Sequence, residues 1–152
     1  RYDASGDLRA WFTPEEEEEY ERRSRGLVTT FSAFQPVPDI NVNGEITLLE
    51  NLADLNGLSV AYRAYVLSLK GKPAPVIDGF TGPQRFFLGY ARMWRMKVRD
   101  NYLRQSLLSQ QYAPEEFRAN GAVQHLGAFH DAFGVTAGDR LFREPDERVW
   151  LW

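Results

Sequence analysis

The stretch TLLENLADLNGL, residues 47–58, decides how the chain is interpreted, because it places two carboxylates in an otherwise apolar run. Glu50 and Asp54 lie four residues apart, and residues at this spacing share one face of a helix, where two acids repel one another unless a cation lies near them. In one interpretation, Thr47 and Glu50 form a capping box at a helix start, and Asp54 is a solvated surface acid. In the other, the pair is half of a metal site. Residues 47–58 alone leave both interpretations open.

The composition limits the class of protein. The chain has 152 residues, of which 43% are hydrophobic, so residues 1–152 are expected to form a single domain with a sizeable core. The net charge is -3 and the sequence shows no basic stripe, which argues against a nucleic-acid partner. The sequence contains no cysteine, which excludes disulfides and thiolate metal sites.

Apolar periodicity and capping signals predict a mainly α fold with long loops and little strand. Thr13 is a plausible N-cap, with Pro14 at the first helical position and Glu16 completing a capping box. Leucines 48, 52 and 55, with Val60, recur near helical spacing in a second helix. Further helices are expected from about residue 83, over 101–111, and within 126–135, where Gly134 ends the last one.

Three segments are expected to have a particular local structure or degree of burial. Residues 40–46, INVNGEI, are expected to form a short extended segment. Residues 112–123, YAPEEFRANGAV, are expected to form a loop with one helical turn at most. Residues 83–100 are dense in aromatic and apolar side chains and are expected to be largely buried, with Phe86, Phe87, Tyr90 and Trp94 in the core.

The remaining chemistry-bearing residues do not complete an active site. His125 and His130 are five residues apart, a spacing that does not align two metal ligands on one helical face, and they are expected to be surface or partly buried helix residues. Arg118, in the expected loop, is typical of a surface charge. The sequence has no HExxH motif, no glycine-rich phosphate loop and no nucleophile signature.

Four separated blocks resemble, in order and spacing, the neprilysin family of zinc metallopeptidases, which includes endothelin-converting enzymes and bacterial oligopeptidases. The blocks are VNGEITLLENLADLNGL (42–58), QRFFLGYARMWRMKVRD (84–100), APEEFRANG (113–121) and ERVWLW (147–152). The opening RYDASGDLRAWFTPEE (1–16) resembles the stretch that follows the family's HExxH helix. The resemblance implies the C-terminal helical part of a zincin-like metallopeptidase catalytic domain, with the HExxH segment just upstream of Arg1.

The resemblance assigns roles to individual residues. Glu50 matches the third ligand of a single zinc ion, and Asp54 matches an acid that accepts the ring N–H of a zinc-binding histidine. Arg118 matches an arginine that hydrogen-bonds a backbone carbonyl of the peptide substrate. Met93 and Trp94 fall where the family lines a specificity pocket for large apolar side chains. These implied roles favour the metal-site interpretation of Glu50 and Asp54.

The chain also departs from the family pattern. Leu49 replaces a glycine, which is expected to crowd the helix start. Tyr112 replaces a histidine that stabilises the oxyanion of the tetrahedral intermediate, and either takes over that catalytic role or only packs over Pro114 and Phe117. The HExxH motif, with two zinc ligands and the general base, is absent. The matching Asn43–Gly44 turn is expected to be structural.

The resemblance implies that the intact parent is a zinc metalloendopeptidase that hydrolyses oligopeptides, while this chain alone is expected to be inactive. The implied partners are a peptide substrate and the missing N-terminal part of the same polypeptide, with self-association of the isolated chain. The absence of cysteine, which the family's animal members contain, suggests a bacterial source. Because bacterial relatives are often exported, the resemblance implies a periplasmic or extracellular location. The alternative is a non-catalytic peptide-binding or interaction domain on a degenerate peptidase scaffold, which an unrelated sequence upstream of Arg1 would favour.

Overall fold

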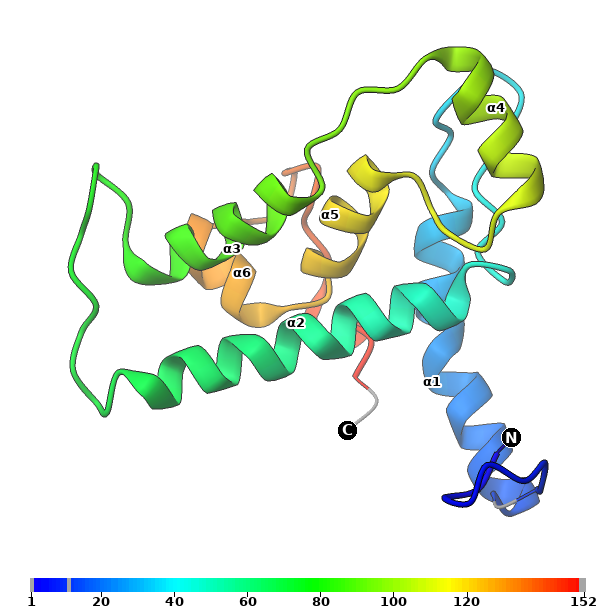
Figure 1. Ribbon diagram of the computed structural model, residues 1–152. Helices are drawn as coiled ribbons and strands as arrows, with labels where there is room; N and C mark the ends of the chain where they lie inside the picture. The colour runs from blue at the N-terminus through cyan, green and yellow to red at the C-terminus, as the bar shows by residue number, and fades with distance from the viewer. Residues whose placement is uncertain (1, 11, 151–152) are drawn as a thin grey trace.

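The computed structural model describes residues 2–10 and 12–150, whose main elements are helices (Figure 1). The helices are α1 (Pro14–Ser32), α2 (Leu48–Ser68), α3 (Gly82–Met93), α4 (Asp100–Ser109), α5 (Glu115–Val123), α6 (Gly127–Phe133) and the 3-10 helix η1 (Pro145–Glu147). Among these described residues the backbone pairs only in isolated bridges, without a sheet. The mainly α prediction is therefore confirmed. The last two residues of the ERVWLW block lie outside the described residues.

Helix α1 begins with the capping box predicted from the sequence. The amide of Glu16 donates to Oγ1 of Thr13 at 3.2 Å, and the amide of Thr13 donates to Oε2 of Glu16 at 2.8 Å. Pro14 occupies the first turn, where its missing N–H has no cost. The buried face of α1 carries Leu27 and Phe31, both fully excluded from solvent, and this face anchors the core.

The core forms where α2 packs against α1 and α5 (Figure 1). Leu52, Leu55 and Leu58 of α2 are buried against α1 and α5. Val60, expected to continue this apolar face, is instead 69% exposed, because it lies on the side of α2 that no described residue covers. Leu49 is likewise 71% exposed, so it does not crowd the start of the helix as expected.

Helices α2 and α3 meet through aromatic rings. Tyr62 of α2 stacks on Phe87 and meets Phe86 edge-on, each with ring centroids 5.2 Å apart. The expectation that residues 83–100 are largely buried is wrong, because Phe87 and Gly82 are the buried residues of α3. Beyond the helix, Met96 is 59% exposed, so one apolar side of this region is uncovered within the described part of the chain.

Helix α5 corrects a prediction, because residues 115–123 form a regular helix in place of the expected loop. Glu115 and Glu116 lie in its first turn, where acids stabilise the positive end of the helix dipole. Asn120–Gly121 is a pair that usually marks a turn. Here Gly121 is needed inside the helix, because a Cβ atom at this position would overlap the ring of Phe31.

Residues 40–46 form no strand: Ile40 makes an isolated bridge with Val37, residues 41–43 have no regular secondary structure, and residues 44–46 form a turn. The side chain of Asn43 accepts the amide of Ile46 at 3.0 Å, and the amide of Gly44 donates to Oγ of Ser32 at 3.2 Å. A Cβ atom at Gly44 would collide with the backbone carbonyl of Val28 in α1. The turn therefore acts structurally, by bringing the start of α2 onto α1.

Two other expectations about helix ends agree with the structure. The segment 101–111 was expected to continue or restart the preceding helix, and it restarts as α4 after α3 ends at Met93. Gly134 ends α6 with a left-handed backbone, φ +63°, that glycine adopts without strain.

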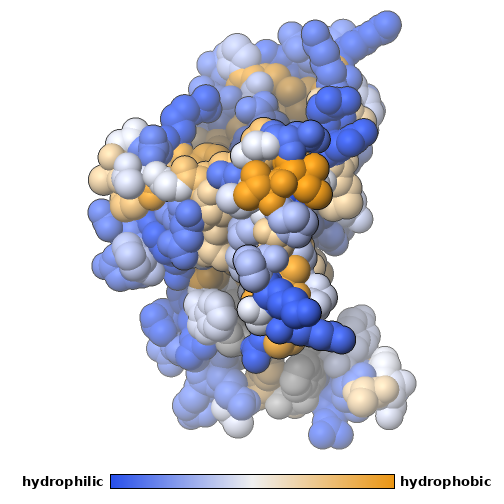
Figure 2. Space-filling view, turned by 90° about the vertical axis from the view of Figure 1, so that its left-hand side faces the viewer, coloured by the Kyte–Doolittle hydropathy of each residue, from blue (hydrophilic) through white to orange (hydrophobic). Residues whose placement is uncertain are grey.

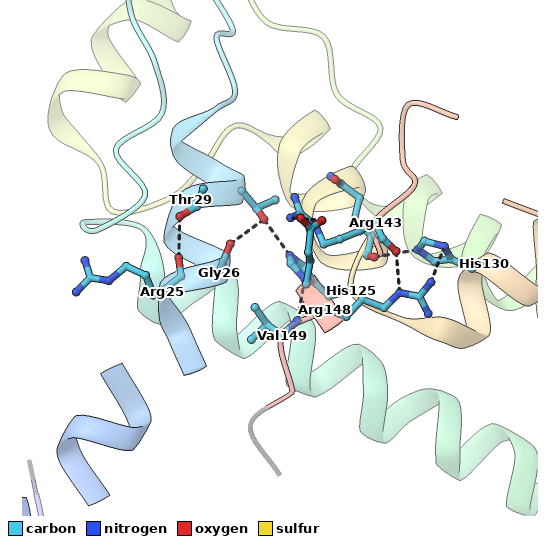
Figure 3. Close-up of polar contacts among 11 residues, drawn as sticks. Arg25, Gly26, Thr29, His125, His130, Arg143, Arg148 and Val149 are labelled. Carbon is cyan, nitrogen blue, oxygen red and sulfur yellow. Dashed lines mark hydrogen bonds and ion pairs between the residues drawn. The ribbon is translucent and has the colours of Figure 1, made fainter. Parts of the chain in front are cut away.

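The two histidines are more buried than expected, with 4% exposure each. Nδ1 of His125 accepts the amide of Val149 at 3.0 Å, and Nε2 donates to the hydroxyl oxygen of Thr30 at 3.2 Å (Figure 3). The Thr30 hydroxyl in turn donates to the carbonyl of Gly26 at 2.9 Å, so its oxygen is the acceptor toward His125. His125 therefore ties α1 to the C-terminal segment in its neutral form.

His130 makes a parallel connection one helix later (Figure 3). Its Nε2 lies 2.9 Å from the carbonyl of Gln124, which can only accept, and its Nδ1 lies 3.2 Å from Nη2 of Arg148, which can only donate. Both histidines thus hold the C-terminal segment through Nδ1 as an acceptor. Burial, followed by the positive charges of Arg143 and Arg148, lowers the pKa of His125 to about 3, which keeps the ring neutral.

Candidate active site

The first turns of α2 present Glu50 and Asp54 without the capping box. The hydroxyl of Thr47 donates to the carbonyl of Asn43 at 2.9 Å and accepts from the amide group of Asn51 at 2.9 Å. It makes no side-chain cap to the helix, and the amide of Thr47 bonds the carbonyl of Asn43. The capping interpretation of Glu50 is therefore contradicted, and its carboxylate is free for another partner.

Arg118 of α5 provides the cation that the acid pair needs. Its Nε and Nη2 donate to Oδ2 and Oδ1 of Asp54 at 2.6 and 2.8 Å, a bidentate arrangement. Nη2 also lies 4.0 Å from Oε2 of Glu50. The side chains of Arg118 and Asp54 are only 14% and 11% exposed, whereas that of Glu50 is 30% exposed. The capping interpretation expected Asp54 to be solvated, and Arg118 was expected to be a surface charge. Both side chains are instead nearly buried.

The charges of this group stabilise one another. Burial alone would lower the pKa of Arg118, but the hydrogen bonds and the negative charge of Asp54 outweigh it, with a further contribution from Glu50. The pKa of Arg118 is therefore raised above its ordinary value, and the guanidinium stays charged. A partly desolvated cation between two acids is an unusual structure for a surface and typical of a functional site.

Aromatic side chains enclose the guanidinium of Arg118. Its central carbon lies 4.2 Å from the ring centroid of Trp94 and 5.4 Å from that of Tyr112, both within cation–π range. The hydroxyl of Tyr90 donates to the backbone carbonyl of Arg118 at 3.1 Å. Asp54 from α2, Trp94 from the end of α3 and Arg118 from α5 are thus brought together from distant parts of the sequence.

A pocket of about 210 Å³ opens beside these residues, and we call it the Arg118 pocket. It is lined by Trp94, Val98, Tyr102, Leu103, Ser106, Gln110, Tyr112, Ala113, Pro114, Glu115 and Arg118. Three of the predicted site residues therefore share one pocket. Glu50 and Asp54 are not among its lining residues, so Arg118 connects the acid pair to the pocket.

Met93 and Tyr112 are the more exposed site candidates. Met93 is 67% exposed and does not line the Arg118 pocket. Tyr112 is 49% exposed, and its ring faces Arg118, while Phe117 stacks on Phe34 with ring centroids 4.6 Å apart. The phenol of Tyr112 is thus free to meet a ligand at the mouth of the pocket.

The described residues 2–10 and 12–150 contain no cluster of three or more His, Asp or Glu side chains that could hold a metal ion. Glu50 can supply one ligand, because its carboxylate is 30% exposed and its approach to Arg118 within the described residues is a loose one, at 4.0 Å. Tyr90 was not recognised as a site residue from the sequence, since its position in an aromatic stripe indicates only core.

Comparison with known proteins identifies the class. Residues 1–149 match the peptidase family M13, and the chain belongs to this family. It is 33% identical to neprilysin-21 of Caenorhabditis elegans and 28% identical to the neutral endopeptidase of Lactococcus lactis subsp. cremoris, covering 99% and 100% of this chain. The predicted membership of the neprilysin-like peptidase family is confirmed. The chain spans about a fifth of each of these relatives, 20% and 22%.

Solved structures agree with the sequence comparison. The zinc metalloprotease Zmp1 of Mycobacterium tuberculosis, in complex with an inhibitor, superposes with a TM-score of 0.95 and is 43% identical over 99% of this chain and 24% of its own. PepO of Lactobacillus rhamnosus superposes with a TM-score of 0.79 at 32% identity, over 97% of this chain and 22% of its own. The fold is therefore that of the C-terminal helical part of this family's structures.

The described residues include no helix that is both long enough and apolar enough to cross a membrane.

Proposed function

We propose that this chain is the C-terminal part of a zinc endopeptidase that hydrolyses oligopeptides. The observation that carries the proposal is the convergence of Glu50, Asp54 and Arg118 from two helices, beside a pocket walled by Trp94 and Tyr112. The relatives named above are endopeptidases or zinc metalloproteases, which supports the reaction class. We refer below to the longer polypeptide that would contain this chain as the intact protein.

The residues of this chain are compatible with a zinc site to which they would contribute one of three protein ligands. A catalytic zinc needs three protein ligands and an open position, and carboxylate oxygen is one of its accepted ligands. Glu50 would provide one ligand, and an HExxH segment of the intact protein would provide two histidines. The ion, when bound, would supply Lewis-acid polarisation of water and of the peptide carbonyl.

Asp54 would position both a histidine and Arg118. Its two oxygens already accept from Arg118, but a carboxylate has about four acceptor sites, so it retains capacity for a histidine N–H. An acid in this position fixes the tautomer and orientation of a metal-binding histidine. The same carboxylate would thereby link the metal to the substrate-binding arginine.

Arg118 would bind the substrate backbone. Its Nη1 takes no part in the bidentate bond with Asp54, so it remains a donor for a peptide carbonyl. Trp94 holds the guanidinium plane from one side, which reduces the conformational freedom that binding would otherwise remove. Met93 and Trp94 would present apolar surface to a large side chain of the substrate.

Tyr112 would donate to the oxyanion that develops on the attacked carbonyl. A phenol O–H can donate one hydrogen bond. Its ring lies beside Arg118 at the mouth of the Arg118 pocket, so both donors would approach a substrate from the same side. Donors arranged in advance toward a developing charge are usually the largest single contribution to catalysis.

The uncovered apolar side chains support an additional N-terminal part in the intact protein. Leu49, Val60 and Leu67 form an exposed stripe along α2, between 69% and 71% exposed. The loop between α2 and α3 adds Val76, Ile77 and Phe80, and apolar atoms gather on the side of the molecule from which this loop projects (Figure 2). Large exposed apolar patches mark interfaces, and in the isolated chain they favour self-association.

The alternative is a non-catalytic peptide-binding domain on the same scaffold. The replacement of the family's oxyanion histidine by Tyr112 favours this alternative, whereas the intact Glu50, Asp54 and Arg118 group opposes it. An HExxH motif upstream of Arg1 would distinguish the two. A periplasmic or extracellular location is part of the proposal and rests on the resemblance to exported family members.

The test uses the intact protein and a fluorogenic oligopeptide. Arg118→Met should lower kcat/KM by about 100-fold, the scale of a lost charged hydrogen bond near 3 kcal/mol. Arg22→Met is the matched control, because Arg22 is an exposed arginine of α1 that pairs with Glu19 and does not line the Arg118 pocket, and it should leave kcat/KM within twofold of the wild type. Unchanged turnover in Arg118→Met, or absence of any peptidase activity in the zinc-loaded intact protein, would contradict the proposal.

A further inference from the structure

Tyr90 contacts both the main chain of Arg118 and the ring of Trp94, although the proposed reaction does not use it. Its hydroxyl donates to the backbone carbonyl of Arg118 at 3.1 Å. Its ring meets Trp94 edge-on, with centroids 6.3 Å apart and planes at 79°. The face of Trp94 in turn carries the guanidinium of Arg118 at 4.2 Å. Tyr90 therefore reaches Arg118 both at its main chain and through the ring that supports its side chain.

The phenol of Tyr90 remains a hydrogen-bond donor at any working pH. Burial, and then the nearby negative charge of Asp54, raise the pKa of Tyr90 to about 12, while Trp94 and Arg118 act in the opposite direction. The phenol of Tyr90 therefore stays protonated and able to donate to the carbonyl of Arg118.

Asp54 and Trp94 both hold the guanidinium, and they come from different parts of the fold. Asp54 holds it from α2 and Trp94 supports it from the end of α3. Neither of these contacts fixes the main chain of α5, from which Arg118 extends. The hydroxyl of Tyr90 supplies this fixation, because it joins α3 to α5 at the carbonyl of Arg118 itself.

We propose that Tyr90 is a positioning residue for substrate binding, which holds α5 so that Arg118 stays against Trp94 and near Glu50. The proposal rests on the substrate-binding role proposed for Arg118. Tyr90 touches no substrate. It acts by keeping the donor of Arg118 in place before the peptide arrives, and such support determines how well a binding group performs.

The test is a double-mutant cycle in the intact protein with Tyr90→Phe, Arg118→Met and the double variant, measuring kcat and KM on a fluorogenic oligopeptide. Tyr90→Phe removes one oxygen and keeps the ring on Trp94. It should raise KM by about three- to tenfold, as expected for one lost hydrogen bond, with kcat within about twofold. In the Arg118→Met background the same change should leave KM unaltered, because residues that act through one another are not additive.

Tyr62→Phe is the matched control, since Tyr62 packs between α2 and α3 on the rings of Phe86 and Phe87, away from Arg118. It should leave KM unchanged. If Arg118→Met turns over too slowly for KM to be measured, the double-mutant cycle can use the dissociation constant of a hydroxamate dipeptide inhibitor instead. Calorimetry measures this constant for all four proteins.

Two results would overturn the role of Tyr90 alone. One is an unchanged KM in Tyr90→Phe. The other is an equal rise in KM in the wild-type and Arg118→Met backgrounds, which would indicate a merely structural contribution. If Arg118→Met itself binds and turns over like the wild type, the proposed role of Arg118 fails together with that of Tyr90. The three results are distinguishable within one data set.

Discussion

At the scale of single residues, Asp54 and Arg118 form a bidentate pair that is nearly withdrawn from water. Removing one partner of such a pair leaves an unpaired buried charge, whereas removing both relieves it. The pair therefore matters to the fold as well as to the proposed reaction. Its two roles can be separated by measuring stability without metal or substrate.

We predict that Asp54→Asn lowers the free energy of unfolding of the metal-free intact protein by about 3 kcal/mol, because Arg118 loses its carboxylate. The double variant Asp54→Asn, Arg118→Met should recover part of this loss. Urea denaturation followed by circular dichroism measures both changes. Glu45→Gln is the control, because Glu45 pairs with Arg25 in an ion pair whose side chains are 62% and 64% exposed, and it should cost little. Equal losses for Asp54→Asn and Glu45→Gln would contradict the buried pair.

Tyr112 gives a second prediction at this scale. If its phenol donates to the oxyanion, Tyr112→Phe in the intact protein should lower kcat about 100-fold while changing KM less, the usual effect of losing one oxyanion donor. Steady-state kinetics on a fluorogenic oligopeptide measures it. Tyr62→Phe is a suitable control, because Tyr62 packs on the rings of Phe86 and Phe87 and does not line the Arg118 pocket. A kcat equal to that of the wild type would leave Tyr112 as a packing residue and Arg118 as the sole stabilising group from this chain.

At the scale of elements, α5 matters most because it carries Arg118 to the acid pair. Its interior Gly121 faces the ring of Phe31, so the helix can approach α1 only without a side chain there. Helix propensity alone would favour alanine at this position by about 1 kcal/mol. The overlap with a fully buried ring is the larger effect, since overpacking of a core costs about 1–3 kcal/mol.

We therefore predict that Gly121→Ala destabilises the protein by up to about 2 kcal/mol after the gain in helix propensity is subtracted. The matched control is Gly57→Ala in α2, where an added Cβ meets no atom within 4 Å and should stabilise the helix. Thermal unfolding by calorimetry compares the two variants. A rise in Tm for both would mean that α5 does not depend on this close approach.

The sequence predicted those elements whose signals are local. The capping box of Thr13 and Glu16 and the end of α6 at Gly134 each depend on residues close together in sequence. Both predictions are confirmed. Helix α5 was missed because the Asn120–Gly121 pair resembles a turn, and its real reason, the ring of Phe31, lies ninety residues away in sequence. The buried histidines were missed for the same reason, since their partners Thr30 and Val149 lie on distant segments.

The site shows the same division. Glu50, Asp54 and Arg118 came from the resemblance to a family, and the geometry then brought them together. No local pattern indicates that Asp54 pairs with Arg118 across 64 residues, or that Tyr90 reaches the carbonyl of Arg118. Contacts between helices depend on how the helices pack, which propensity and periodicity do not specify.

At the scale of the whole molecule, the C-terminal segment is held by neutral His125 (Figure 3). The pKa of His125 is about 3 in the folded state, below its ordinary value of 6.5. The unfolded chain therefore binds a proton below pH 6.5 that the folded chain does not. The contribution of neutral His125 to the free energy of unfolding is complete above pH 6.5. It is lost as the pH falls from 6.5 toward 3, at up to about 1.4 kcal/mol per pH unit.

His125→Asn should reduce the dependence of stability on pH between 6.5 and 4, because the variant has no titrating group at this position. Urea denaturation at several pH values measures the slope for both proteins. A wild-type stability that does not fall over this range, or a variant with the same slope as the wild type, would contradict the neutral histidine. His130 remains in both proteins and serves as the internal comparison.

The central claim is that this chain contributes one zinc ligand, Glu50, to a site completed by the rest of the intact protein. The direct measurement is the zinc content of the intact protein, determined by elemental analysis after dialysis. It compares the wild type with Glu50→Gln and with the control Glu45→Gln. The isolated 152-residue chain is measured in the same way. We predict about one zinc per molecule in the wild type and in Glu45→Gln, and almost none in Glu50→Gln or in the isolated chain, because a catalytic site needs three protein ligands. Full zinc occupancy in Glu50→Gln, or a tightly held zinc in the isolated chain, would contradict the claim.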